Sequence, residues 1–186
     1  VNVVTWTDLS SSYATSAGWT GTKQGLISYD PGGYYNSSIV SNFENLGEKN
    51  SGHPSNLTNF LDYSTVNYPA EKYALILWDH GAGIYGVCSD DTNGHDILQL
   101  DEIRAAVNAS SQFSSSQPLD LIGYDACLMQ IIEYASGMSD FANVMVASQE
   151  TEPGDGWDYQ AFLSRLQMNP QMDAFSLGDA IVETYY

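Results

Sequence analysis

The stretch YALILWDHGAG (residues 73–83) decides the fold, because a strand-length apolar run ends directly in a histidine followed by glycine. PLDLIGYDAC (residues 118–127) has the same form and ends at Cys127. A third apolar run, NVMVAS (143–148), leads into the polar loop 149–157. Short apolar runs of this kind are typical of a parallel sheet, and in α/β proteins the loops that follow such strands bind ligands.

Helical periodicity occupies the intervals between these strands. In residues 56–63, Leu57, Phe60 and Leu61 have the i, i+3, i+4 spacing of one helical face. The other predicted elements are a strand at 1–6 and helices at 38–46, 100–107, 128–135, 160–167 and 176–186. Strands that alternate with helices predict an α/β fold, with a mostly parallel sheet, helices on both faces and a single domain over 1–186.

The composition is strongly acidic: five Lys or Arg face 23 Asp or Glu in 186 residues, a formal net charge of −18. Such a surface repels phosphate backbones and anionic lipid headgroups, so we expect no nucleic-acid partner and no membrane insertion. No apolar run approaches the ~20 residues that a membrane span needs. The acidity fits an extracellular or saline habitat, and it favours cationic partners at low ionic strength.

The two cysteines, Cys88 and Cys127, are too few for a disulfide scaffold and lack the spacing of zinc ligands. A disulfide between them is one alternative, and it would make both inert. We interpret Cys88 as a packing residue, because no helix start follows it. His53 and His95 lie in polar segments and are interpreted as solvated.

His80 and Cys127 end consecutive strands, so we expect their side chains at one edge of the sheet. We also expect Cys127 to open a helix, whose unpaired N–H groups and dipole would favour the thiolate. His80 would then act as the base, and the N–H groups of Gly81 and Cys127 would form an oxyanion hole. The alternatives are a turn histidine and a buried core cysteine.

Three sequence blocks resemble conserved blocks of the clostripain-like cysteine peptidases. They are WDHGAG (78–83), DACLM (125–129) with Glu133, and SQETEPGDGW (148–157). The resemblance is dense over residues 57–157 and implies a caspase-like three-layer α/β sandwich, shared in outline with gingipains, legumains and separases.

For function, the resemblance implies a secreted cysteine endopeptidase that hydrolyses protein or peptide substrates. His80 and Cys127 would form its catalytic dyad, with a thioester acyl-enzyme and no required cofactor. The family prefers Arg or Lys before the scissile bond, and Asp125 matches the family position that pairs with this cation. Asp155 is a second candidate for substrate binding. An N-cap of the predicted helix is the alternative role for Asp125.

Some members of the family depend on calcium, which takes oxygen ligands. Asp90, Asp91, Asn93 and Asp96 could supply such ligands, although their spacing does not match an EF-hand loop. A structural calcium ion is therefore a hypothesis for this segment, and no catalytic metal is expected.

The chain departs from the family pattern at both ends. Members carry a central strand between the equivalents of 1–6 and 73–78, and further strands after the equivalent of the last residue. We expect both to be missing from this chain, so that other segments of its own precursor are partners. Arg104, the only Lys or Arg between the candidate catalytic residues, lies in a predicted helix, which argues against activation cleavage there.

Two other functions stay open on the sequence. One is a non-catalytic binding or scaffold domain that keeps the peptidase fold. The other is an acyl transferase or ligase that uses the same dyad, because a thioester reacts with an amine as well as with water.

Overall fold

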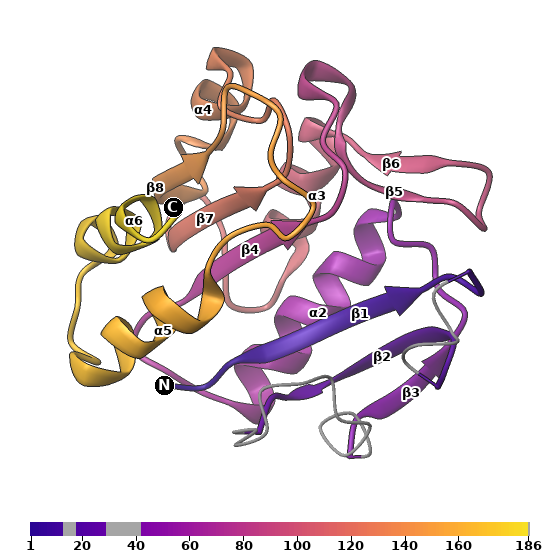
Figure 1. The fold of residues 1–186 in the computed structure, drawn as a ribbon, viewed down its shortest axis with the longest axis horizontal. Coiled ribbons are helices and arrows are strands. Elements are labelled where there is room, and N and C mark those ends of the chain that lie inside the picture. Colours follow the sequence, from indigo (N-terminus) through magenta and orange to yellow (C-terminus); the bar gives the residue numbers. More distant parts are fainter. Residues whose placement is uncertain (13–17, 29–41, 186) are drawn as a thin grey trace.

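The computed structural model describes residues 1–12, 18–28 and 42–185 (Figure 1). The strands are β1 (Val4–Leu9), β2 (Gly21–Leu26), β3 (Glu44–Gly47), β4 (Ala74–Trp78), β5 (Val87–Asp90), β6 (Asp96–Leu98), β7 (Leu119–Asp125) and β8 (Ala142–Ala147). The helices are α2 (Pro54–Asn67), α3 (Leu100–Ala109), α4 (Ile132–Met138), α5 (Tyr159–Met168) and α6 (Ala174–Glu183), with a 3-10 turn, η1 (Gly83–Tyr85). Among the described residues, no helix is both long and apolar enough to cross a membrane.

The three predicted strands form one parallel sheet in the order β4-β7-β8, which confirms that part of the prediction. Trp78 pairs with Asp125 at the carboxyl end of β4, and Tyr124 pairs with Ala147 at the end of β7. The carboxyl ends of all three strands therefore meet at the same edge of the sheet.

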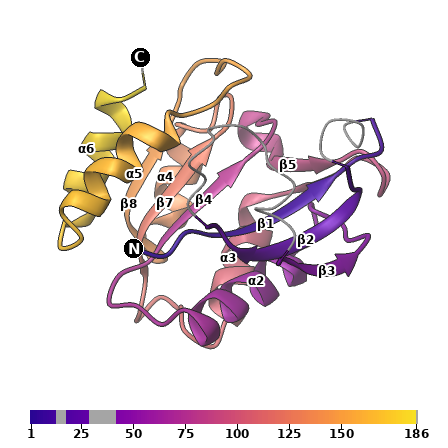
Figure 2. The same ribbon diagram turned by 60° about the horizontal axis from the view of Figure 1, so that its bottom comes forward.

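Helices cover both faces of this sheet (Figure 2). One core joins helices α2, α3 and α4 to strands β4 and β7 through Leu57, Leu61, Ile103, Val107, Tyr134, Met138, Leu75, Leu77, Ile122 and Tyr124. The other joins α5 and α6 to the opposite face through Phe162, Ala180, Ile181, Leu121 and Val146. Because successive strand residues point to opposite faces, one buried strand serves both cores. The structure thus has the three layers that the sequence predicts.

The N-terminal strand differs from the prediction in place and in pairing. β1 begins at Val4 and pairs antiparallel with β2, which in turn pairs antiparallel with β3. Within the described residues this sheet is separate from the parallel one, of which β4 is the outer strand. Apolar periodicity could not reveal β2, because its buried residues include Thr22 and Gln24, which hydrogen-bond to acidic side chains of β1 and β3.

One further prediction needs correction. The helix predicted at 38–46 is wrong in its last part, because residues 44–46 belong to β3, while residues 38–41 lie outside the described residues. The polar segment from Asp90 to Asp96 belongs to a hairpin of β5 and β6, which the sequence did not predict. Gly94 and His95 close its turn with φ values of 77° and 58°.

Candidate active site

The ends of β4 and β7 bring the two predicted catalytic residues to one edge of the sheet (Figure 1). Trp78 and Asp125 form the last pair of the two strands. His80 and Cys127 each lie two residues beyond that pair. A side chain on Gly81 would clash with the carbonyl oxygen of Cys127 and lie 3.1 Å from its backbone nitrogen. Glycine at this position therefore lets the two loops pack backbone against backbone.

Two backbone donors at this contact have no acceptor among the described residues. Within the described part of the chain, the N–H groups of Gly81 and Cys127 donate to no other group. Most backbone N–H groups in folded proteins are paired, so two unpaired ones beside a thiol are unusual. Both remain available to a bound substrate oxygen.

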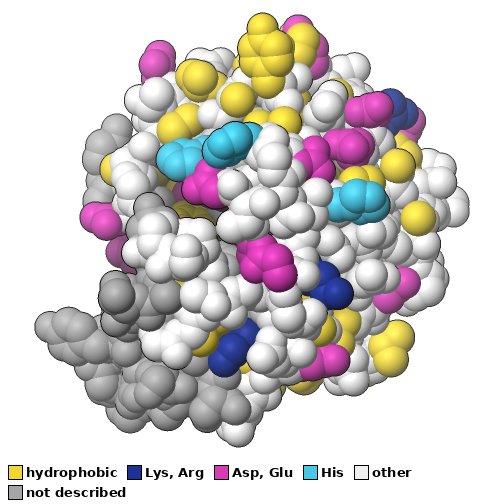
Figure 3. Space-filling view, turned by 90° about the vertical axis from the view of Figure 1, so that its right-hand side faces the viewer, with side chains coloured by type: hydrophobic (Ala, Val, Ile, Leu, Met, Phe, Trp, Pro, Cys, Tyr) yellow, Lys and Arg dark blue, Asp and Glu magenta, His cyan; other side chains and the backbone are white. Residues whose placement is uncertain are grey.

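His80 is held by its backbone while its side chain is exposed. Its carbonyl oxygen accepts a hydrogen bond from the N–H of Cys88 at 3.2 Å, and the imidazole makes no hydrogen bond to any described residue. Burial raises the pKa of the neighbouring Asp79 above its ordinary value, against the opposing effect of His80. Histidine side chains lie at the surface among acidic ones on the face in Figure 3. The imidazole is therefore anchored at its base and open to solvent.

The helix predicted to begin at Cys127 does not form there. α4 starts at Ile132, five residues later, and Leu128 has a φ of 64°, in the left-handed region that no helix contains. The N–H of Leu128 donates to the carbonyl of Glu150, and that of Gln130 to the carbonyl of Ser148. This segment therefore pairs with the loop after β8, and the prediction that a helix dipole activates the thiol is wrong.

The loop that follows β8 covers the thiol of Cys127. The N–H of Glu152 donates to the sulfur at 3.2 Å, and the carbonyl oxygen of the same residue lies 4.0 Å from it. This backbone contact fixes the position of the sulfur beneath the loop. Both cysteines are free, so the alternative of a disulfide with Cys88 is not formed. Cys88 packs against the core, and burial raises the pKa of its thiol.

Asp125 lies beneath this loop and is only 2% exposed. Its Oδ2 atom accepts hydrogen bonds from the backbone N–H of Trp157 at 3.1 Å and from the hydroxyl of Tyr159 at 2.9 Å. Its Oδ1 atom is buried without a partner. A side chain on Gly156 would come within 3.0 Å of both carboxylate oxygens. No helix begins near Asp125, so the alternative role as an N-cap is wrong.

Glu152 joins this site although the sequence did not single it out. Its Oε1 atom accepts a hydrogen bond from the indole N–H of Trp157 at 3.2 Å, and its Oε2 atom is buried without a donor. Burial, and then a hydrogen bond with Asp125, raise the pKa of Glu152 to about 7. Asp155, the other predicted binding residue, is exposed in the turn of the same loop, and the structure shows no contact between it and Asp125.

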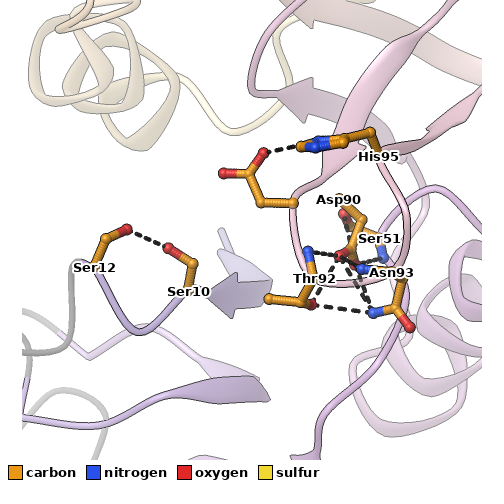
Figure 4. A network of polar contacts seen from close by, with 8 residues as sticks. Ser10, Ser12, Ser51, Asp90, Thr92, Asn93 and His95 are labelled. Atoms are coloured by element: carbon orange, nitrogen blue, oxygen red, sulfur yellow. Dashed lines mark hydrogen bonds and ion pairs between the residues drawn. The ribbon is translucent and has the colours of Figure 1, made fainter.

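Two residues of the calcium hypothesis, Asp90 and Asn93, are hydrogen-bonded to each other (Figure 4). Asp90 accepts hydrogen bonds from the backbone N–H groups of Ser51, Thr92 and Asn93, each at 2.8 Å. Although burial opposes it, these bonds hold the pKa of Asp90 below its ordinary value. Asp91 pairs with His95, and Asp96 accepts from Asn50.

A different set of carboxylates converges close by. Asp8, Glu48 and Asp90 place oxygens within 4.8 Å of one another. Burial, followed by the charges of Glu48 and Asp90, raises the pKa of Asp8. The calcium hypothesis for the hairpin remains a prediction. His53, interpreted as solvated, is exposed and also caps α2 by accepting the N–H of Ser55.

The fold is similar to that of solved C11 cysteine proteases. A secreted C11 cysteine protease from Bacteroides thetaiotaomicron, in complex with an irreversible peptide inhibitor, has a TM-score of 0.75 and 21% identity, over 100% of this chain and 47% of that one. An inactive zymogen C11 protease from Parabacteroides distasonis has a TM-score of 0.68 and 20% identity, again over 100% and 47%. This likeness establishes the caspase-like fold that the sequence predicts.

The sequence is also similar to that of a characterised relative. Clostripain of Hathewaya histolytica is 34% identical over 139 residues, which make up 64% of this chain and 25% of clostripain. The chain thus spans about a quarter of that relative and about half of the solved proteases. The model of the clostripain family, peptidase family C11, matches residues 35–186. The chain therefore belongs to the clostripain family.

Proposed function

We propose that this chain carries the catalytic residues of a cysteine endopeptidase. The observation that supports this most is the packing of Gly81 on the backbone of Cys127, with His80 at the same sheet edge. The thiolate of Cys127 attacks the substrate carbonyl, and protonated His80 gives its proton to the leaving amine. Water, deprotonated by His80, then attacks the thioester, which releases the acid product and the thiol.

The unpaired N–H groups of Gly81 and Cys127 support the proposed oxyanion hole. In each tetrahedral intermediate the former carbonyl oxygen carries a negative charge. Two donors that have no other acceptor can bind that charge without first losing a hydrogen bond. Removal of one such donor costs about 3–4 kcal/mol of transition-state stabilisation in well-studied hydrolases.

We also propose cleavage after Arg or Lys. The buried, partly unpaired carboxylate of Asp125 supports this preference, because a cation that leaves water needs a charged partner. Asp155 stays a second candidate, which would have to approach the substrate from the exposed turn of its loop. The acidic net charge of −18 also favours basic protein or peptide substrates.

The proposal also covers the location, cofactor needs and partners of the enzyme. We propose an extracellular enzyme that needs no cofactor and whose partners include other segments of its own precursor. An acyl transferase or ligase would form the same thioester and would transfer it to an amine. A non-catalytic domain would form no thioester.

Covalent labelling tests this proposal. The full-length protein is treated with an acyloxymethyl ketone that carries Arg or Lys, and the adduct is mapped by mass spectrometry. We expect labelling at Cys127 that is lost in Cys127→Ala and in His80→Ala. His95→Ala is the matched control, because this exposed histidine lies outside the site. A folded protein that is not labelled would rule out the peptidase.

A further inference from the structure

The site contains two buried carboxyl groups that face each other without a cation. Asp125 contributes Oδ1 and Glu152 contributes Oε2, and neither atom has a hydrogen-bond donor. The other oxygen of each group is occupied, one by Trp157 N–H and Tyr159 hydroxyl, the other by the Trp157 indole. The two groups are adjacent, since each also accepts a hydrogen bond from Trp157, and each keeps one oxygen without a donor.

Among the described residues, no Lys, Arg or His forms an ion pair with either acid. The ion pairs of the described residues are His95 with Asp91 and Arg165 with Glu183, both elsewhere. The titratable group that contacts Asp125 and interacts electrostatically with Glu152 is the Tyr159 hydroxyl. Burial and the charge of Asp125 raise the pKa of Tyr159, so this hydroxyl stays neutral.

The remaining neighbour is also uncharged. The indole nitrogen of Trp78, from the end of β4, lies with both Asp125 oxygens within 3.0 Å of the position that a side chain on Gly156 would take. Among the described residues, the donors to the two acids are Trp157 and Tyr159, and both are neutral.

A carboxyl group that is buried beside a second carboxyl group keeps its proton to a higher pH than it would in water. One proton held between them gives each unsatisfied oxygen a partner, and a raised pKa of about 7 for Glu152 is the expected consequence. The shared proton and a bound cation are two alternative ways to balance the same charge. A guanidinium or an ammonium group carries both the charge and the donors that the two oxygens lack.

We propose that Glu152 is a second specificity-determining residue, which binds the guanidinium or ammonium group of a basic substrate side chain together with Asp125 and releases their shared proton as the cation enters. This inference rests on the proposed peptidase function and deepens it. The exchange balances: a neutral acid and a carboxylate become two carboxylates, one cation enters, and one proton leaves to solvent. The net charge of the site stays at −1.

Glu152 also links the two acids to the nucleophile. The backbone N–H of Glu152 donates to the sulfur of Cys127, while its carboxyl group faces Asp125. A cation between the two acids therefore acts on the residue that covers the thiol. Cation binding at the two acids and access to the sulfur are therefore coupled through one residue.

Calorimetry with agmatine, a guanidinium compound without a carboxylate, tests the proposal on the full-length protein. Titrations in two buffers with different ionisation enthalpies give the number of protons released. At pH 6 we expect the wild type to release about one proton per agmatine bound. Affinity should rise about tenfold per pH unit below pH 6.5 and level off above about pH 7, as linkage to one proton requires.

Glu152→Gln should abolish the proton release and remove the pH dependence of binding. Near-UV circular dichroism checks that this variant is folded, and Glu152→Asp, which keeps the charge, should restore proton release. Glu150→Gln is the matched control, because it removes the same charge from an exposed position of the same loop. Binding without proton release, or no binding by folded wild type, would overturn the proposal.

Kinetics separate this proposal from the peptidase itself. With Arg and Lys substrates, Glu152→Gln should lower kcat/KM about 10- to 100-fold, the effect of one charged contact, and a neutral residue at the same substrate position should show no such loss. If the ketone labels wild type and Glu152→Gln equally and their kcat/KM values agree, the peptidase stands and the role of Glu152 falls. If agmatine releases a proton from a wild type that no ketone labels, the cation site stands and the peptidase falls.

Discussion

Gly81 and Gly156 shape the site by the side chains that they lack. At Gly81 an added carbon would meet the backbone of Cys127, and at Gly156 it would meet the carboxylate of Asp125 and the indole of Trp78. Backbone and buried groups cannot move aside as a flexible surface side chain would. These two positions therefore determine how closely the loops after β4, β7 and β8 approach one another.

The substitution Gly81→Ala adds one carbon atom and tests the close packing of Gly81 on Cys127. We expect the rate of Cys127 labelling by the arginyl ketone to fall at least about 100-fold, since a displacement of about 1 Å in such a site has effects of that size. Overpacking should also lower the free energy of unfolding by about 1–3 kcal/mol. Gly154→Ala is the control, because a side chain there meets open space. Wild-type labelling in Gly81→Ala would contradict the close packing.

Glu152 should also affect stability as a function of pH. Burial first, and then the hydrogen bond with Asp125, raise the pKa of Glu152 from its ordinary value of 4.5 to about 7. Between these values the folded protein holds a proton that the unfolded chain has lost. The stabilisation is therefore fully present below about pH 4.5 and is lost as the pH rises through about 7.

Urea unfolding of wild type and Glu152→Gln over this range measures that contribution. As the pH rises, the free energy of unfolding of the wild type should fall relative to that of Glu152→Gln. The comparison cancels the other acids with raised pKa values, Asp8 and Asp79, which both proteins share. A difference that does not change with pH would show that Glu152 titrates normally.

The loops and hairpins, rather than the strands, carry the interactions that specify the site. The turn after Cys127 and the loop after β8 are joined by two backbone hydrogen bonds, from Leu128 to Glu150 and from Gln130 to Ser148. The hairpin of β5 and β6 is organised around the carboxylate of Asp90. In both places polar contacts replace the apolar packing that holds the sheet.

Asp90→Ala should destabilise the protein strongly. The backbone N–H groups of Ser51, Thr92 and Asn93 would lose their acceptor in a region where Asp90 is 2% exposed. We expect a loss of about 2–4 kcal/mol in the free energy of unfolding, measured in urea with a chelator present. Asp91→Ala is the control and should change stability by less than about 1 kcal/mol, because its pair with His95 is exposed.

The calcium hypothesis can be tested on the same element. If the hairpin binds calcium, millimolar calcium should raise the Tm of wild type by mass action, and the chelator should reverse the rise. The Asp90→Ala protein should show a smaller increase. An unchanged Tm in wild type would rule out calcium binding by this segment.

At the scale of the whole molecule, the three layers hold a strongly charged protein together. Two separate cores on the faces of one parallel sheet support the edge where His80 and Cys127 lie. The net charge is −18, and acidic side chains are spread over the face in Figure 3. A negative field of this kind attracts basic substrates over distances of about the Debye length, ~10 Å at 0.1 M salt.

The charge should therefore make the proposed activity depend on salt. For a basic peptide substrate we expect kcat/KM to fall several-fold between 0.02 and about 0.5 M salt, with kcat nearly unchanged, because salt screens the encounter rather than the chemistry. A neutral substrate of the same length should show little dependence. Equal salt dependence for both substrates would indicate that the field does not act on the encounter.

The sequence by itself determined the elements whose apolar pattern is local. Strands β4, β7 and β8, most of the helices, the sheet edge with His80 and Cys127, and the family could all be predicted, because they depend on periodicity and on short blocks of residues. The polar strand β2 could not be, since hydrogen bonds to neighbouring strands, and no apolar repeat, keep Thr22 and Gln24 buried.

Only the tertiary structure decided how the thiol and the acids are arranged. The sequence placed Cys127 at the start of a helix, whereas contacts with the loop 25 residues further along hold it in a turn. The pairing of Asp125 with Glu152 joins two residues that share no local pattern. Such contacts arise because buried polar groups need hydrogen-bond partners, which can come from distant parts of the chain. A local pattern of residues does not show which of these groups will be in contact.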